Sequence, residues 1–137
     1  MSLNEKIIEQ ILERDYIFGK LCLEAENSFN HKNYFSALAC LFVLTEQIIK
    51  FSVDKIDGNF NGAIIEAKKN NLIDDTEFQL LNSLREIRNK IFHENHYPIG
   101  LEIEGKFWSF SEDETRELIY KKFSMKLFQL TLRIIKG

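Results

Sequence analysis

The residues best suited to chemistry gather in one segment, residues 84 to 97, which reads LREIRNKIFHENHY. It contains two of the three histidines of the chain and two arginines, Arg85 and Arg88. Histidine titrates near neutral pH and can act as a general base or a general acid. Arginine offers a permanent, forked positive charge that suits phosphate oxygens. These residue types could cleave RNA without a metal, since the reaction needs proton transfer at two oxygens and a cation beside the phosphate.

Helical spacing sets how these side chains can meet. We expect residues 72 to 92 to form a helix, because apolar side chains recur on one face at about 100° per residue. That face consists of Leu80, Leu84, Ile87 and Ile91. Arg88 lies beside it and should be partly buried. In strict helical geometry Arg88 and His93 point about 140° apart, so they share a ligand only if the helix loosens or a second subunit contributes.

Each of these residues also has a purely structural interpretation. An arginine against an apolar face is costly unless it is paired, so Arg88 could belong to a structural ion pair while His93 lies at the surface. Glu46 either forms a solvated pair with Lys50 one turn further along its helix, or reaches across the bundle to Arg88 or His93. The sequence leaves both alternatives open.

The hexapeptide from Arg88 to His93, RNKIFH, resembles the R-x4-6-H motif of HEPN domains. These are small all-helical domains, and many are metal-independent ribonucleases. The match lies near the end of a late amphipathic helix, and the wider resemblance covers residues 27 to 135. Some HEPN ribonucleases also carry a Glu-x-x-x-Lys element, as at Glu46 and Lys50. Many of them continue with a basic residue where this chain has Phe51.

The resemblance implies a role for each residue of the motif. His93 would transfer protons, Arg88 would stabilise the phosphate and Asn89 would orient either of them. Two copies of the motif across a homodimer would supply a matched acid and base, without metal or other cofactor. The remaining residues expected to contribute are Arg85, Lys90 and His96, as contacts to nucleic acid, and Glu46, as support.

Other functions and partners also follow from this segment. Some HEPN toxins are paired with a nucleotidyltransferase antitoxin that modifies a tyrosine just after the motif histidine, and Tyr97 lies near that place at a longer spacing. The alternative function is a non-catalytic helical module that binds a nucleotide or a partner protein through Arg88. A zinc site is disfavoured, because His93 and His96 are three residues apart, whereas the His-Glu-x-x-His helix needs four.

The length, composition and net charge of the whole chain limit these interpretations. Its 137 residues suit a single domain, residues 1 to 137, and one proline with six glycines favours a helical body. A net charge of −3 means that RNA must bind through a local basic patch. Two cysteines without metal spacing indicate reduced thiols and a cytoplasmic protein. No apolar signal segment stands at the start, and the longest apolar run, residues 37 to 44, is too short for a membrane.

We therefore expect an all-α fold, an up-and-down bundle of four to five helices with a short extended loop or hairpin before the last one. The expected helices are residues 5 to 29, 34 to 53, 63 to 71, 72 to 92, and a final helix that follows a capping box at Ser111 and Glu114. The final helix has two apolar stripes on nearly opposite sides. Such a helix is either sandwiched within the bundle or part of a homodimer contact.

Overall fold

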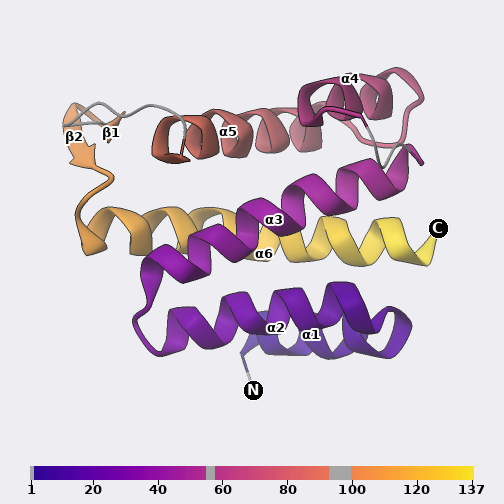
Figure 1. The fold of residues 1–137 in the computed structure, drawn as a ribbon, viewed down its shortest axis with the longest axis horizontal. Coiled ribbons are helices and arrows are strands. Elements are labelled where there is room, and N and C mark those ends of the chain that lie inside the picture. The colour runs from indigo at the N-terminus through magenta and orange to yellow at the C-terminus, as the bar shows by residue number, and fades with distance from the viewer. Residues whose placement is uncertain (1, 55–57, 93–99) are drawn as a thin grey trace.

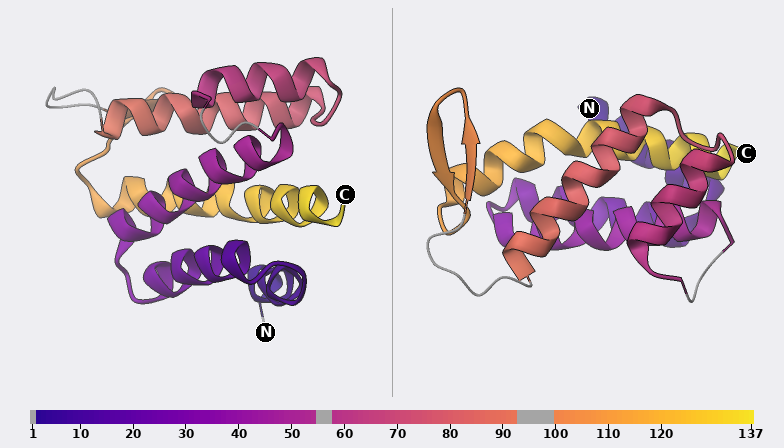
Figure 2. Two further views of the ribbon diagram at one scale, coloured as in Figure 1. Left: turned by 45° about the vertical axis from the view of Figure 1, so that its right-hand side comes forward. Right: turned by 90° about the horizontal axis from the view of Figure 1, so that it is seen from above.

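The computed structural model describes residues 2–54, 58–92 and 100–137. Within these ranges the fold is all-α, as predicted, with six helices and one small antiparallel hairpin. In chain order the elements are α1 (Leu3–Arg14), α2 (Tyr16–Asn30), α3 (Tyr34–Ser52), α4 (Phe60–Lys69), α5 (Asp75–Phe92), β1 (Gly100–Ile103), β2 (Lys106–Ser109) and α6 (Asp113–Lys136). The helices stack in layers, with α1 and α2 on one side, α3 and α6 in the middle, and α4 and α5 on the other side (Figures 1 and 2).

The central element is α3, which contacts α2, α4, α5 and α6. Its buried side chains contribute to two adjoining cores: Leu41 and Ile48 belong to the larger one, and Ile49 to a smaller one beneath α4. By length and composition alone α3 could cross a membrane, but the core helix of a soluble protein passes the same test. Because α3 contacts every layer, it can bring polar side chains of its own next to those of α5.

The first expected helix is divided in two at Asp15, so the bundle has six helices rather than four or five. Asp15 has an extended backbone, and its carboxylate accepts a hydrogen bond from the Phe18 N–H at 3.0 Å, which caps α2. Gly19 lets α1 and α2 approach closely, since a Cβ there would lie 2.6 Å from the Cα of Leu12. The apolar spacing continues across the break because both helices face the same core, so periodicity alone did not reveal it.

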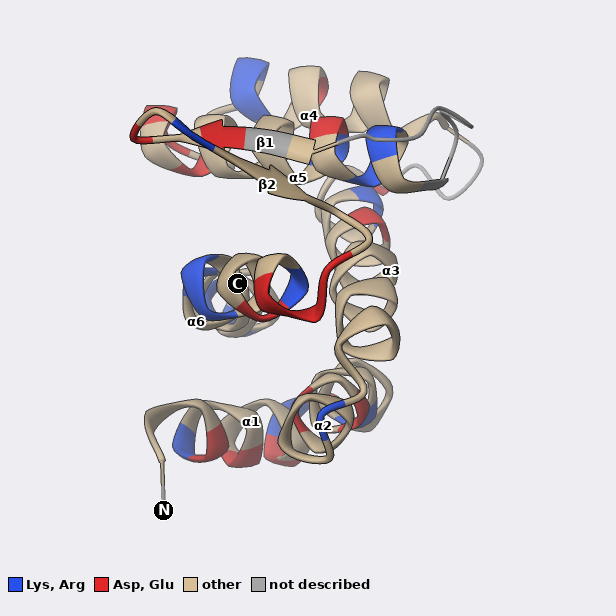
Figure 3. Cartoon of the chain, turned by 90° about the vertical axis from the view of Figure 1, so that its left-hand side faces the viewer, with Lys and Arg blue, Asp and Glu red and all other residues tan. Residues whose placement is uncertain are grey.

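The expected extended segment before the last helix is a hairpin. β1 pairs with β2 in antiparallel register, with Gly100 opposite Ser109. Glu104 and Gly105 form its two-residue turn, and both have positive φ angles of 51° and 78°. Figure 3 shows this hairpin at the level of α4 and α5, with α6 between that level and the layer of α1 and α2.

The predicted capping box at Ser111 is wrong. Helix α6 begins at Asp113, and its N-cap residue, Glu112, makes no side-chain capping bond. The Ser111 hydroxyl instead lies 2.9 Å from that of Ser109. Ser111 thus interacts with Ser109, the last residue of β2, and does not cap α6 as the sequence pattern predicted.

Both apolar stripes of α6 are used within the chain. Phe123, Leu127 and Phe128 lie in the larger core, and Leu130 lies in the smaller one. The helix contacts α1, α2, α3 and α5, so it is sandwiched, which was one of the two alternatives. The second stripe therefore no longer argues for a homodimer, and the homodimer stays a prediction.

Candidate functional site

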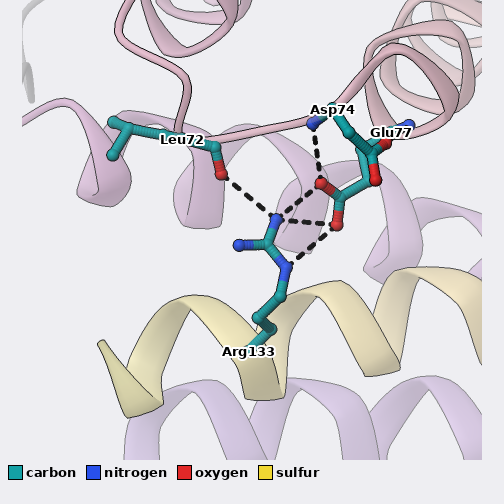
Figure 4. A network of polar contacts seen from close by, with 4 residues as sticks. All are labelled: Leu72, Asp74, Glu77 and Arg133. Atoms are coloured by element: carbon teal, nitrogen blue, oxygen red, sulfur yellow. Dashed lines mark hydrogen bonds and ion pairs between the residues drawn. The ribbon is translucent and has the colours of Figure 1, made fainter.

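The candidate site depends on α5, whose first turn is firmly held. The Asp74 N–H donates to Glu77 Oε1 at 2.9 Å and the Glu77 N–H donates to Asp74 Oδ1 at 2.7 Å, which is a reciprocal capping box. Arg133 of α6 donates to both carboxylate oxygens of Glu77, at 2.6 to 3.0 Å, and to the Leu72 carbonyl at 3.1 Å (Figure 4). These bonds fix the start of α5 and hence the direction in which its later side chains point.

The apolar face of α5 lies against the bundle as predicted. Leu84 and Ile87 are buried in the larger core, and Leu81 is buried in the smaller one. This packing places Arg88 beside Ile87 with its side chain 20% exposed, which confirms the expected partial burial. The Arg88 Cζ atom lies 4.8 Å from the ring centroid of Phe60, the first residue of α4. An aromatic face at this distance attracts a guanidinium.

Glu46 of α3 joins the two helices at this point. Its Oε2 atom lies 3.5 Å from Arg88 Nη1, and its Oε1 atom lies 3.2 Å from Lys50 Nζ. Both alternatives weighed for Glu46 thus hold together, since one carboxylate serves the local pair and the cross-bundle contact. Arg88 Nη2 also donates to Asn89 Oδ1 at 3.3 Å. The structure therefore brings together Glu46, Lys50, Arg88 and Asn89, which we call the Arg88 cluster.

The hydrogen-bonding capacity of this region is not used up. The Nε atoms of Arg85 and Arg88 are buried and have no hydrogen-bond partner among the described residues. Arg85 precedes Arg88 by three residues, so both lie on neighbouring parts of the same helix face. A buried N–H without an acceptor costs free energy. Both Nε atoms are closed off from solvent in this conformation, so an anion reaches them only if a neighbouring side chain moves, and an anionic ligand would first meet the exposed part of the Arg88 side chain.

The other predicted site residues are distributed differently. Lys90 lines a cleft on another side of α5, together with Glu102 of the hairpin and Lys122 of α6. It is about 200° from Arg88 around the helix, which separates the two side chains. The predicted set of nucleic-acid contacts thus falls on two surfaces. His93, His96 and the tyrosine that follows lie outside the described residues, so their relation to Arg88 stays a prediction.

Among the contacts that Arg88 makes with the described residues, the one with Phe60 was missed by sequence reasoning. The residues around it read as a turn because of their asparagines and glycines, yet Asn59 caps α4 by accepting from the Gly62 N–H at 2.6 Å. That cap was the available signal for a helix starting at Phe60. Nothing in the sequence pairs this ring with an arginine 28 positions later.

The described residues contain no group of three or more histidine, cysteine or acidic side chains placed to hold a metal ion. Their concentrated chemistry is the Arg88 cluster and the unpartnered guanidinium nitrogens beside it. Models of known protein families, curated protein sequences and solved structures were all compared with this chain, and none of them matches it.

Proposed function

We propose that this protein is a metal-independent endoribonuclease of the HEPN type that acts as a homodimer. The observation that carries the proposal is the setting of Arg88. Glu46, Asn89 and Phe60 hold its guanidinium five residues before His93 in the sequence, and its buried Nε has no acceptor among the described residues. Glu46 of the Glu-x-x-x-Lys element and the motif arginine lie in contact. A role as a toxin or in defence against phage would suit this activity.

The proposed reaction is cleavage by the neighbouring 2′-hydroxyl. His93 of one subunit removes the hydroxyl proton, the oxygen attacks the phosphorus, and the bond to the 5′-oxygen breaks. His93 of the second subunit gives a proton to that leaving oxygen. Arg88 donates to the phosphate oxygens as negative charge builds up on them. The products are a 2′,3′-cyclic phosphate and a free 5′-hydroxyl, and every proton is accounted for.

An exposed apolar surface beside the Arg88 cluster supports the proposed homodimer. Val43 and Phe51 of α3 are 48% and 53% exposed, and they flank Glu46 and Lys50 along the helix. Phe51 contacts the ring of Phe18 at the start of α2. The two residues before Phe18, Tyr16 and Ile17, are 68% and 79% exposed. Association through this surface would bring two Arg88 clusters towards each other, as a shared active site requires.

The decisive test is cleavage of a labelled single-stranded RNA in excess EDTA. Wild type should cut it and leave a 2′,3′-cyclic phosphate, whereas His93→Ala should not. The matched control is His31→Ala, because His31 caps the end of α2, in the layer opposite α5, and its Nδ1 lies 2.7 Å from the Asn27 carbonyl oxygen. Full activity in His93→Ala would show that the assignment is wrong. Phe51→Asp should lower both the molecular mass in solution and the cleavage rate.

The second candidate is a non-catalytic module that binds a nucleotide or a partner protein. The ion pair favours it, because Glu46 already neutralises part of the Arg88 charge. In this case wild type and His93→Ala would both fold and both fail to cut RNA. Arg88→Ala would then weaken binding of a nucleotide such as ATP, measured by calorimetry. Cleavage by wild type alone excludes this candidate.

A further inference from the structure

A groove runs between α5 and α6 on a side of α5 that the Arg88 cluster does not use. Near the start of α5 it forms a cavity of about 450 Å³, and beside the hairpin it forms one of about 200 Å³. Ser83 and Phe123 line both cavities, so the two adjoin each other. The lining of the groove extends along α6 from Leu118 to Arg133, which spans about 22 Å, or four helical turns.

The two walls of the groove carry different charges over an apolar floor: the α5 wall has Glu77, Glu86 and Lys90, and the hairpin adds Glu102. The floor consists of Leu80, Ile87, Ile119, Phe123 and Leu130. All three charged residues on the α6 wall are basic: Lys122, Lys126 and Arg133. Arg133 is neutralised by Glu77. Lys122 and Lys126 are exposed, and neither forms an ion pair with an acidic side chain in the described part of the chain.

We propose that this groove binds an acidic amphipathic helix of a partner protein. An apolar floor four turns long accommodates the apolar face of one helix. Lys122 and Lys126 stand one turn apart at the middle of the groove, so they match two carboxylates one turn apart on the flank of a bound helix.

A nucleic acid fits this surface less well. Its phosphates would gain nothing from the apolar floor, which the apolar face of a bound helix would cover. The proposal does not rest on the ribonuclease activity, because the groove contains neither Arg88 nor Glu46.

The probe for this groove is a designed amphipathic helix of about 16 residues, with leucines along one face and glutamates on the flanks. Its binding is measured by fluorescence anisotropy against a peptide with lysine in place of every glutamate. The acidic peptide should bind about tenfold tighter, since two ion pairs replace two repulsions. The double variant Lys122→Glu/Lys126→Glu should reverse this preference. The matched control is Lys20→Glu/Lys69→Glu, which changes two exposed lysines on α2 and α4 and should keep it.

Equal binding of the two peptides, or no effect of the reversal, would overturn the proposal. Displacement of the acidic peptide by single-stranded RNA, with the same dependence on Lys122 and Lys126, would also overturn it, because the groove would then be a nucleic-acid surface. The measurement is repeated in the His93→Ala protein. Peptide binding there, whatever the outcome of the RNA assay, separates this proposal from the proposed function.

Discussion

Two arginine–glutamate ion pairs connect α5 to neighbouring helices. The hydrogen-bond donors of the two arginines are satisfied to very different degrees. Arg133 is half exposed, yet it contacts both oxygens of Glu77 at 2.6 to 3.0 Å and also the Leu72 carbonyl. Arg88 is only 20% exposed, yet its contact with Glu46 is 3.5 Å long and its Nε has no partner among the described residues. The more buried of the two arginines is the less satisfied one.

This order is the reverse of what stability alone favours. An unsatisfied donor costs more in a buried place than in water, so a structural arginine gains most from complete bonding where it is most buried. Arg133 meets the requirement of a structural residue, and its partner Glu77 also caps α5. Arg88 keeps capacity for a further acceptor. The comparison therefore supports a ligand-binding role for Arg88 and a structural role for Arg133, and the predictions below test this division.

The largest effect is expected from Arg88→Ala. If Arg88 stabilises the phosphate, its removal should lower the rate of RNA cleavage at least about 100-fold, as the loss of one charge-stabilising donor does in other enzymes. Arg88→Lys should also be impaired, because an ammonium group cannot present the forked guanidinium donors. Arg133→Ala should leave the rate nearly unchanged. Equal losses of activity in Arg88→Ala and Arg133→Ala would contradict the division.

The next effect is a loss of stability in Glu77→Ala. This change removes the capping box and the partner of Arg133, so the free energy of unfolding should fall by about 1–2 kcal/mol. Arg133→Ala, which keeps the cap and removes a half-exposed pair, should cost only about 0.5 kcal/mol. Urea unfolding followed by circular dichroism measures both. If Arg88→Ala destabilises the protein more than Glu77→Ala does, Arg88 is the structural residue and the comparison is wrong.

A smaller effect is expected from Glu46→Gln. The amide oxygen can still accept from Arg88, but the charge that competes with a phosphate is gone. Binding of a 2′-O-methyl RNA, which lacks the attacking hydroxyl, should therefore tighten about two- to threefold. Glu46→Ala should lower the cleavage rate, because Arg88 would lose its positioning contact. Weaker binding by Glu46→Gln than by wild type would show that the charge of Glu46 does not compete with RNA.

Much of the fold could be predicted from the sequence because local signals agreed with tertiary packing. Tyr34 begins the central helix as expected, and Asp74 and Glu77, which have the three-residue spacing of a capping box, form one. Prediction from the sequence failed where two local signals competed. Asp15 lies inside a continuous apolar pattern, and its capping role is recognisable only once the chain is seen to turn there. Ser111 has a capping spacing, but its hydroxyl engages the hairpin.

The site was predictable as far as helical spacing reaches. The partial burial of Arg88 followed from its place beside Ile87, and Glu46 was one of two stated possibilities. The ring of Phe60 was not predictable, because the contact joins α4 to the far end of α5 and depends on how the two helices pack. The same spacing could have separated Lys90 from Arg88, since the two lie on different sides of one helix. The role of His93 stays a prediction that the RNA assay tests.

The smallest expected effect is the pH dependence of stability that Glu26 contributes. It would add to any pH dependence of the two arginine sites. Burial raises the pKa of the Glu26 carboxyl above its ordinary value of 4.5, and nearby Glu5 adds to the shift. Hydrogen bonds from Asn4 and Tyr120 oppose it. Because the folded state holds this proton more tightly than the unfolded chain, stability is greatest below pH 4.5 as far as Glu26 is concerned. It falls as the pH rises from there through the raised pKa.

Glu26→Gln should remove this contribution, because the amide never ionises. Its free energy of unfolding should change less than that of wild type over the same rise in pH, and the difference is measured by urea unfolding at a series of pH values. Identical pH profiles would mean that Glu26 ionises as easily in the folded chain as in the unfolded one. If the profiles differ as expected, the Arg88 and Arg133 variants are best compared in the Glu26→Gln background. Any pH dependence of stability that remains in this background comes from other ionisable groups. These include the groups of the Arg88–Glu46 and Arg133–Glu77 ion pairs, which the variants test.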